Sequence, residues 1–174
     1  MLLLTGFFTG MRWSELSALE WRDLDEAQRC IHIRRAQVRQ VVAGTKTRKR
    51  RTISVPEVVL VALRQHRNIQ LREQVPGLSK GLVFPSRAGT YRYPSSIRVA
   101  LDKVCKRAEL KRHVTPHWMR HTFNNLLRQA KVDKVVLRAT TGHQTEAMTE
   151  HYSHVELDEK RDAVEKVLAL VGVS

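Results

Sequence analysis

The chain has 174 residues, 42% of them hydrophobic and 28% charged, which is enough for one compact domain whose core needs no disulfide or metal. Its opening apolar run at 2–4 is too short to cross a bilayer and lacks the flanks of a signal peptide, so a cytoplasmic protein is expected. The 31 Lys and Arg residues against 17 Asp and Glu residues give a formal charge of +14, which predicts a polyanionic partner. Charge alone does not separate DNA from RNA, from anionic lipid or from simple solubility. Cys30 and Cys105 have no metal-ligand spacing and are expected to be buried thiols.

The first segment predicts two helices joined by a turn. An apolar helix over 2–8 is stopped by Thr9-Gly10, and Ser14 is a suitable N-cap for a short helix that ends near Leu19. Arg12 falls in the turn between these two helices.

The region 21–55 favours β-strands, because β-branched residues alternate there and Ile31 and Ile33 share one face. We expect a small antiparallel three-stranded sheet. Its later strands flank a basic hairpin loop at 43–51, which is too charged to be buried and should contact solvent or phosphates. The cations of this loop are Lys46, Arg48, Lys49, Arg50 and Arg51.

The rest of the chain is predicted to be helical. A helix starts at Pro56 and ends near Glu73, and Ser95 or Ser96 caps the next one. The apolar stripe of that second helix should face the core; it contains Ile97, Leu101, Val104, Cys105 and Ala108. Thr115-Pro116 opens a further helix, and two more are expected at about 132–140 and 157–171.

Six polar residues are not needed by this scaffold: Arg12, Lys46, His117, Arg120, His143 and Tyr152. Taken singly, each is an ordinary surface or structural residue. Together, their surroundings resemble the motifs of the tyrosine recombinases of the phage-integrase type: TGMRWSEL at 9–16, TPHWMRHTF at 115–123, and Gly142-His143 followed nine residues later by the tyrosine of Tyr152-Ser153-His154.

The resemblance covers essentially all of the chain, so it implies one catalytic domain over 1–174. The implied fold is α+β and mostly helical, with the small sheet described above. It also implies that the N-terminal core-binding domain typical of the family is absent from this chain, and that the last helix docks either on a neighbouring subunit or on its own chain.

The family chemistry implies a role for each motif residue. Arg12 and Arg120 would bind the nonbridging oxygens of a pentavalent phosphate, with a hydrogen bond from His143. Glu15, one turn after Arg12, would hold that arginine in position.

The remaining residues would move protons and make the covalent bond. Tyr152 would attack the scissile phosphorus, with His117 as base and Lys46 as the acid that protonates the leaving oxygen. Lys49 is a nearby alternative to Lys46. The product is a 3′-phosphotyrosyl enzyme, which a hydroxyl from another strand can reverse.

No metal or cofactor is expected. His117 and His121 lie four residues apart on a predicted helix, but the acidic residues of a zinc site are missing and Arg120 between them would repel a cation.

The resemblance implies double-stranded DNA as the partner, in a bacterial cytoplasm or nucleoid. It implies a homotetramer on DNA that is a monomer when free, and accessory DNA-bending proteins. Two alternatives remain open: a type IB topoisomerase-like enzyme, which shares this set of residues, and a catalytically silent DNA-binding module of the same fold.

Overall fold

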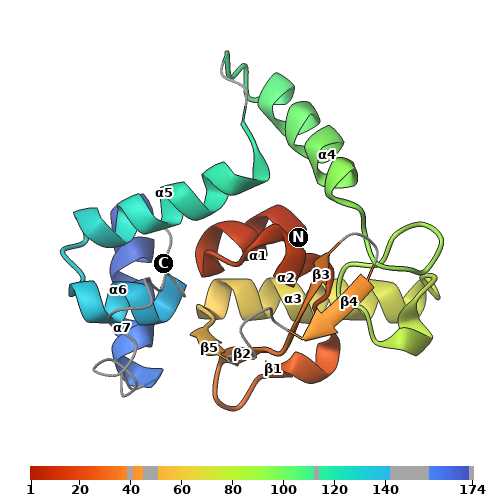
Figure 1. Ribbon diagram of the computed structural model, residues 1–174, viewed down its shortest axis with the longest axis horizontal. Helices are drawn as coiled ribbons and strands as arrows, with labels where there is room; N and C mark the ends of the chain where they lie inside the picture. Colours follow the sequence, from red (N-terminus) through yellow and green to blue (C-terminus); the bar gives the residue numbers. More distant parts are fainter. Residues whose placement is uncertain (39–40, 45–50, 112–113, 142–156, 173–174) are drawn as a thin grey trace.

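The computed structural model describes residues 1–38, 41–44, 51–111, 114–141 and 157–172. In chain order its elements outside the strands are α1 (Leu2–Thr9), α2 (Trp13–Ser17), the 3-10 turn η1 (Trp21–Asp23), α3 (Glu57–Arg72), the 3-10 turn η2 (Leu78–Lys80), α4 (Pro94–Arg107), α5 (Pro116–Gln129), α6 (Lys134–Thr141) and α7 (Leu157–Val171). Helices α5, α6 and α7 gather at one side of the molecule, and α4 projects away from it (Figure 1). No helix among the described residues is long and apolar enough to span a bilayer.

The predicted three-stranded antiparallel sheet is confirmed, with the strand order β1-β2-β5. Its strands are β1 (Leu24–Asp25), β2 (Cys30–Ile33) and β5 (Arg51–Ser54). The strands β3 (Arg35–Val38) and β4 (Val41–Gly44) instead pair with each other as a separate two-stranded ribbon. The strands on either side of the basic loop, β4 and β5, therefore lie in different sheets, and the prediction that they form a hairpin was wrong.

An ion pair explains where this ribbon lies. The Arg35 guanidinium, at the start of β3, lies 2.6 Å from the Glu20 carboxylate and 3.0 Å from the Asp23 carboxylate. Both acids are buried next to η1. Because buried carboxylates require a partner, Arg35 draws the chain away from β2 and places β3 against α2.

The sheet buries one face in the main core. Ile31, Ile33 and Ile53 are almost completely buried there and pack with side chains of α1, α2, α3 and the segment around Phe84. Burial of each such side chain contributes about 1.5–3 kcal/mol to folding. The alternation expected from the sequence is therefore the one that builds the core.

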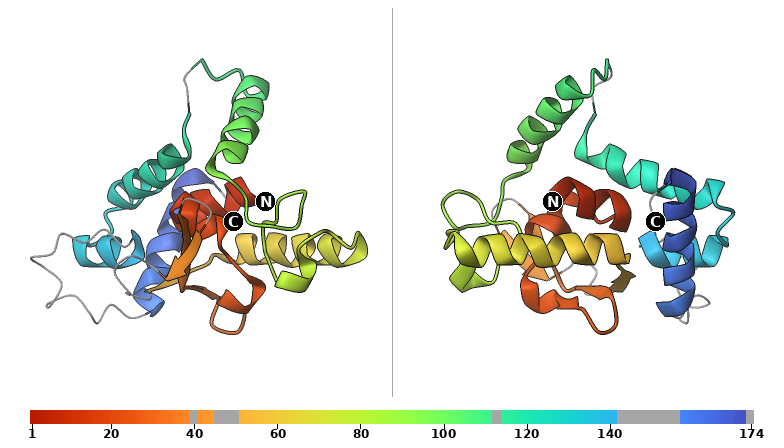
Figure 2. Two further views of the ribbon diagram at one scale, coloured as in Figure 1. Left: turned by 45° about the vertical axis from the view of Figure 1, so that its right-hand side comes forward. Right: turned by 180° about the vertical axis from the view of Figure 1, so that it is seen from behind.

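A second core cluster joins the last three helices. Phe123 and Leu127 of α5 pack against Val136 of α6 and against the buried side of α7, which contains Ala163, Val164 and Val167. Helix α7 also contacts β5. The last helix therefore docks on its own chain in this structure (Figure 2).

The apolar stripe predicted for α4 is only half buried. Ile97 and Leu101 are 2% and 5% exposed, whereas Val104 is 48% exposed and Cys105 is half-buried. Ile97 and Leu101 in the first turns of α4 pack with Met119, and the rest of the helix extends beyond the body of the molecule (Figures 1 and 2). The expectation that the whole stripe faces the core was wrong, while Cys30 is buried as expected.

Several predicted helix caps also differ. The N-cap of α2 is Arg12 and not Ser14, because the Glu15 carboxylate accepts a hydrogen bond from the Arg12 backbone N–H. Tyr93 precedes α4, in which Pro94 takes the first position in place of a serine cap. The Thr115-Pro116 start of α5 is confirmed.

Gly10 ends α1 in a left-handed conformation, with a φ of 60°. A Cβ on Gly10 would lie 2.4 Å from Phe123 Cδ1, so Gly10→Ala adds a steric clash to the backbone strain. We expect it to lower the free energy of unfolding by roughly 2–4 kcal/mol in urea denaturation.

Gly81→Ala is the matched control. Gly81 has a φ of 67°, but a Cβ there would meet nothing within 4 Å. This variant should lose only the strain of about 1–2 kcal/mol. Equal losses in the two variants would contradict the proposed contact between Gly10 and Phe123.

Candidate active site

Arg12 lies in the turn between α1 and α2, directly after the helix-ending Gly10 and Met11. Its backbone N–H donates to Glu15 Oε2 at 2.8 Å, and its Nη1 donates to Glu15 Oε1 at 3.2 Å. The Arg12 side chain is nevertheless 47% exposed. The turn therefore anchors a cationic group that still faces solvent.

Glu15 is buried, with a side chain that is 3% exposed. Arg51, at the start of β5, donates from Nη1 and Nη2 to the two carboxylate oxygens, each at 2.7 Å. Burial raises the pKa of Glu15, but the hydrogen bond and charge of Arg51, and then those of Arg12, lower it by more, so the pKa is lowered overall. Glu15 is therefore ionised near neutral pH.

Arg120 extends from α5 into the interior and is 3% exposed. Its Nη1 donates to the Gly10 carbonyl at 2.7 Å, and its Nη2 donates to the Thr141 carbonyl at the end of α6. Burial, and then the positive charges of Arg12 and Arg51, lower the pKa of Arg120 to about 10. The guanidinium therefore remains protonated near neutral pH.

The structure thus gathers residues from three distant parts of the sequence. Arg12 and Glu15 come from α2 and the turn before it, Arg51 from β5, and Arg120 from α5. Among these four side chains, three positive charges face one negative charge. Such a cluster favours an anion with several oxygen acceptors, as a phosphodiester has.

His117 lies in the first turn of α5 and is exposed, although Arg120 three residues later is buried. The two side chains lie three residues apart on α5 and differ in burial. The His117 ring instead stands edge-on to His121, with 4.4 Å between ring centroids. His117 is thus exposed at the N-terminal end of α5, the same helix that carries Arg120.

Arg51 departs from the expectation for the basic loop. Its side chain is 17% exposed and is bound to Glu15, so it does not project into solvent or onto phosphates as predicted. Its strand position explains this, because residues two apart share a face and Ile53 is completely buried. This alternation was the signal in the sequence that could have indicated the position of Arg51.

The other predicted site residues lie outside the described residues. They are Lys46, His143 and Tyr152, together with the basic residues Arg48, Lys49 and Arg50. Their roles remain predictions.

Residues suited to a metal gather at one place in the described ranges. Asp25, Cys30 and His32 bring ligand atoms within 4.8 Å of one another on β1 and β2. Burial, and then the charge of Asp25, raise the pKa of the Cys30 thiol. The His32 ring lies 3.0 Å from Thr52 Oγ1. In this structure these residues form a partly buried polar cluster on the sheet.

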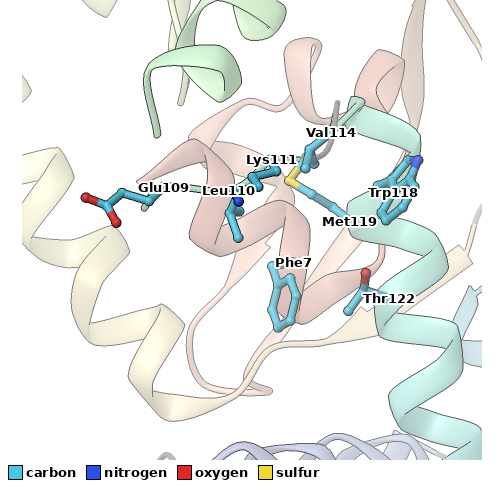
Figure 3. A pocket seen from close by; sticks show the side chains of 8 residues that line it. All are labelled: Phe7, Glu109, Leu110, Lys111, Val114, Trp118, Met119 and Thr122. Atoms are coloured by element: carbon cyan, nitrogen blue, oxygen red, sulfur yellow. The ribbon is translucent and has the colours of Figure 1, made fainter. Parts of the chain in front are cut away.

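A pocket of about 470 Å³ lies between α1, α5 and the segment that follows α4 (Figure 3). Phe7, Leu110, Val114, Trp118 and Met119 supply most of its lining. This lining contains none of the predicted catalytic residues. Its apolar character does not suit a polyanionic substrate.

Residues 1–159 match the profile described as the phage integrase family. The chain belongs to this family. A relative from Oceanobacillus iheyensis, described as tyrosine recombinase XerC, is 32% identical over 161 residues, which cover 91% of this chain and 49% of the relative. A XerC from Xanthomonas campestris is 29% identical over 86% of this chain and 42% of that relative. The chain therefore spans about half the length of these relatives.

Two solved structures have the same fold as this chain. The XerA recombinase has a TM-score of 0.67 at 22% identity, and the match covers 98% of this chain and 57% of XerA. The integrase of transposon Tn1549, solved with transposon right-end DNA, has a TM-score of 0.68 at 26% identity, over 94% of this chain and 57% of the integrase. The predicted tyrosine recombinase catalytic-domain fold is confirmed.

The buried Glu15 carboxylate leads to a pH-dependent prediction. Because folding lowers its pKa below the ordinary 4.5, Glu15 contributes stability above that pH, and the contribution is lost as pH falls through the folded-state pKa. Glu15→Gln should therefore unfold about 3–5 kcal/mol more easily at neutral pH. Its difference from the natural protein should narrow on acidification below pH 4.5.

Urea denaturation at several pH values tests this, with Glu57→Gln as control. Glu57 is half exposed and pairs with the exposed Arg64, so its loss should change stability by less than about 1 kcal/mol. A Glu15→Gln deficit that stays constant down to the acid limit would contradict the assignment.

Proposed function

We propose that this chain is the catalytic part of a site-specific DNA recombinase, which cleaves and rejoins strands through a 3′-phosphotyrosyl intermediate at Tyr152. The observation that carries the proposal is the convergence of Arg12 and Arg120 around Glu15, although these two arginines lie more than 100 residues apart in the chain. Family membership and the similarity to XerC support a recombinase over a type IB topoisomerase.

The two arginines would bind the nonbridging oxygens of the scissile phosphate. A protonated guanidinium makes two parallel hydrogen bonds to such oxygens and needs no proton transfer during the reaction. Arg120 is held by main-chain carbonyls on both sides, so its position is set before substrate arrives. Arg12 would bind from the solvent side, where its side chain is exposed.

The proposed covalent step follows from this charge. Tyr152 attacks phosphorus and His117 accepts the phenolic proton, which helps because a free phenol has a pKa near 10. The bond between phosphorus and the 5′ oxygen breaks, and Lys46 protonates that oxygen as it leaves. His143 donates a hydrogen bond to the phosphate. The 5′ hydroxyl of another strand can then attack the phosphotyrosine and exchange strands.

We propose that the reaction needs no metal, because the arginines supply the positive charge that metal ions supply in many nucleases. The proposed substrate is double-stranded DNA, consistent with the net charge of +14, in the bacterial cytoplasm or nucleoid. The proposed active form on DNA is a homotetramer, assisted by DNA-bending proteins.

A nicked suicide DNA that carries the recombination site tests the nucleophile. In EDTA, the natural protein should form a covalent protein–DNA species on a denaturing gel, and Tyr152→Phe should form none. Tyr93→Phe is the matched control, because Tyr93 is an exposed tyrosine directly before α4. This variant should still form the covalent protein–DNA species.

Two results would count against the proposal. Covalent product from Tyr152→Phe would exclude this tyrosine as the nucleophile. Loss of product in EDTA, restored by added Mg²⁺, would exclude the metal-independent mechanism.

A further inference from the structure

We propose that Arg51 is a positioning residue, which fixes the Glu15 carboxylate and thereby sets how Arg12 is presented to a DNA phosphate. This inference rests on the proposed function, because it assigns the phosphate-binding role to Arg12. It adds a residue to the site that the sequence motifs do not contain.

Arg51 and Arg12 bind the Glu15 carboxylate with different geometries. Arg51 binds both oxygens of Glu15 at 2.7 Å, whereas the Arg12 side chain reaches one oxygen at 3.2 Å. Two parallel hydrogen bonds fix the plane of a carboxylate, and a single bond does not. Arg51 therefore determines the orientation in which Glu15 accepts from the Arg12 backbone and side chain.

Arg12 and Arg51 both donate to the same Glu15 carboxylate oxygen, Oε1. A buried carboxylate is strongly destabilising unless a cationic group pairs with it. Without Arg51, Glu15 would be free to take Arg12 as a two-point partner and to pull its half-exposed guanidinium inward. With Arg51 in place, the backbone N–H and Nη1 of Arg12 both donate to Glu15, and 47% of the Arg12 side chain is exposed.

Arg51 belongs to the three-stranded sheet, where it pairs with Ile33 at the end of β2. It also lies five residues after Lys46, the proposed acid. Because Arg51 of β5 binds Glu15, the sheet is connected to the turn that carries Arg12. The positive charge of Arg51 acts on Arg120 as well.

Single-turnover cleavage of the nicked DNA distinguishes the positioning role of Arg51 from a merely structural role and from a direct phosphate contact. In Arg51→Gln we expect the rate constant to fall roughly 10- to 100-fold, as for a misplaced catalytic group, with DNA affinity and the fraction of active protein unchanged. A merely structural role would lower the active fraction and leave the rate constant unchanged. A phosphate contact would lower the affinity and its salt dependence.

A double variant tests whether Arg51 acts through Glu15, and it also removes the buried carboxylate whose partial loss of partners could weaken folding. Glu15→Gln/Arg51→Gln should cleave no more slowly than Glu15→Gln alone. Multiplied effects would overturn the proposal. Arg51→Lys keeps the charge but not the two-point contact, so complete rescue by lysine would also overturn it.

A measurement without DNA decides the inference even if no cleavage is found. The Arg12 amide hydrogen bonds to Glu15, and its hydrogen exchange, followed by NMR, should accelerate about tenfold in Arg51→Gln. Arg64→Gln, the same charge change at an exposed ion pair, should leave that amide unchanged. Unchanged exchange in Arg51→Gln would overturn the positioning role. Absence of cleavage by the natural protein would instead count against the proposed function.

Discussion

The buried guanidinium of Arg120 is the constraint on which this structure depends. It donates to the carbonyl of Gly10 at the end of α1 and to that of Thr141 at the end of α6, so one side chain connects the first turn of the chain to its last third. Burying an arginine is unfavourable unless its donors are satisfied, and both main-chain segments must hold their positions to satisfy them. The left-handed Gly10, against which Phe123 packs, is part of the same arrangement.

The arrangement has a functional consequence. Electrostatic stabilisation of a phosphoryl transition state is strongest when the donors are in place before the substrate arrives. Here, Arg120 is held by carbonyls, and Arg12 is held by a carboxylate that Arg51 keeps in one orientation. The pKa of Arg120, lowered to about 10, remains high enough for the group to stay charged near neutral pH. The fold thus holds the positive charges of Arg12 and Arg120 in fixed positions, as phosphate binding would require.

Features decided by local signals could be predicted from the sequence. Proline after threonine located the start of α5, and the motif around Arg12 located the turn. Features decided by contacts between distant parts of the chain could not be predicted from the sequence. Arg51 reads as one more cation of a basic loop, but its partner Glu15 lies 36 residues earlier in the chain. Periodicity predicted the stripe of α4, yet periodicity does not say whether a neighbour covers Val104. The roles of Lys46, His143 and Tyr152 rest on the family motifs, because these residues lie outside the described ranges.

The most direct test of the central claim compares Arg120→Ala with the natural protein on two DNAs, one with an ordinary scissile phosphate and one with a neutral methylphosphonate at that position. If Arg120 acts by neutralising charge on a nonbridging oxygen, the loss of cleavage should be large on the phosphate and much smaller on the methylphosphonate. The same loss on both DNAs would contradict the account, because it would mean that Arg120 does not act on the charge of the reacting phosphate.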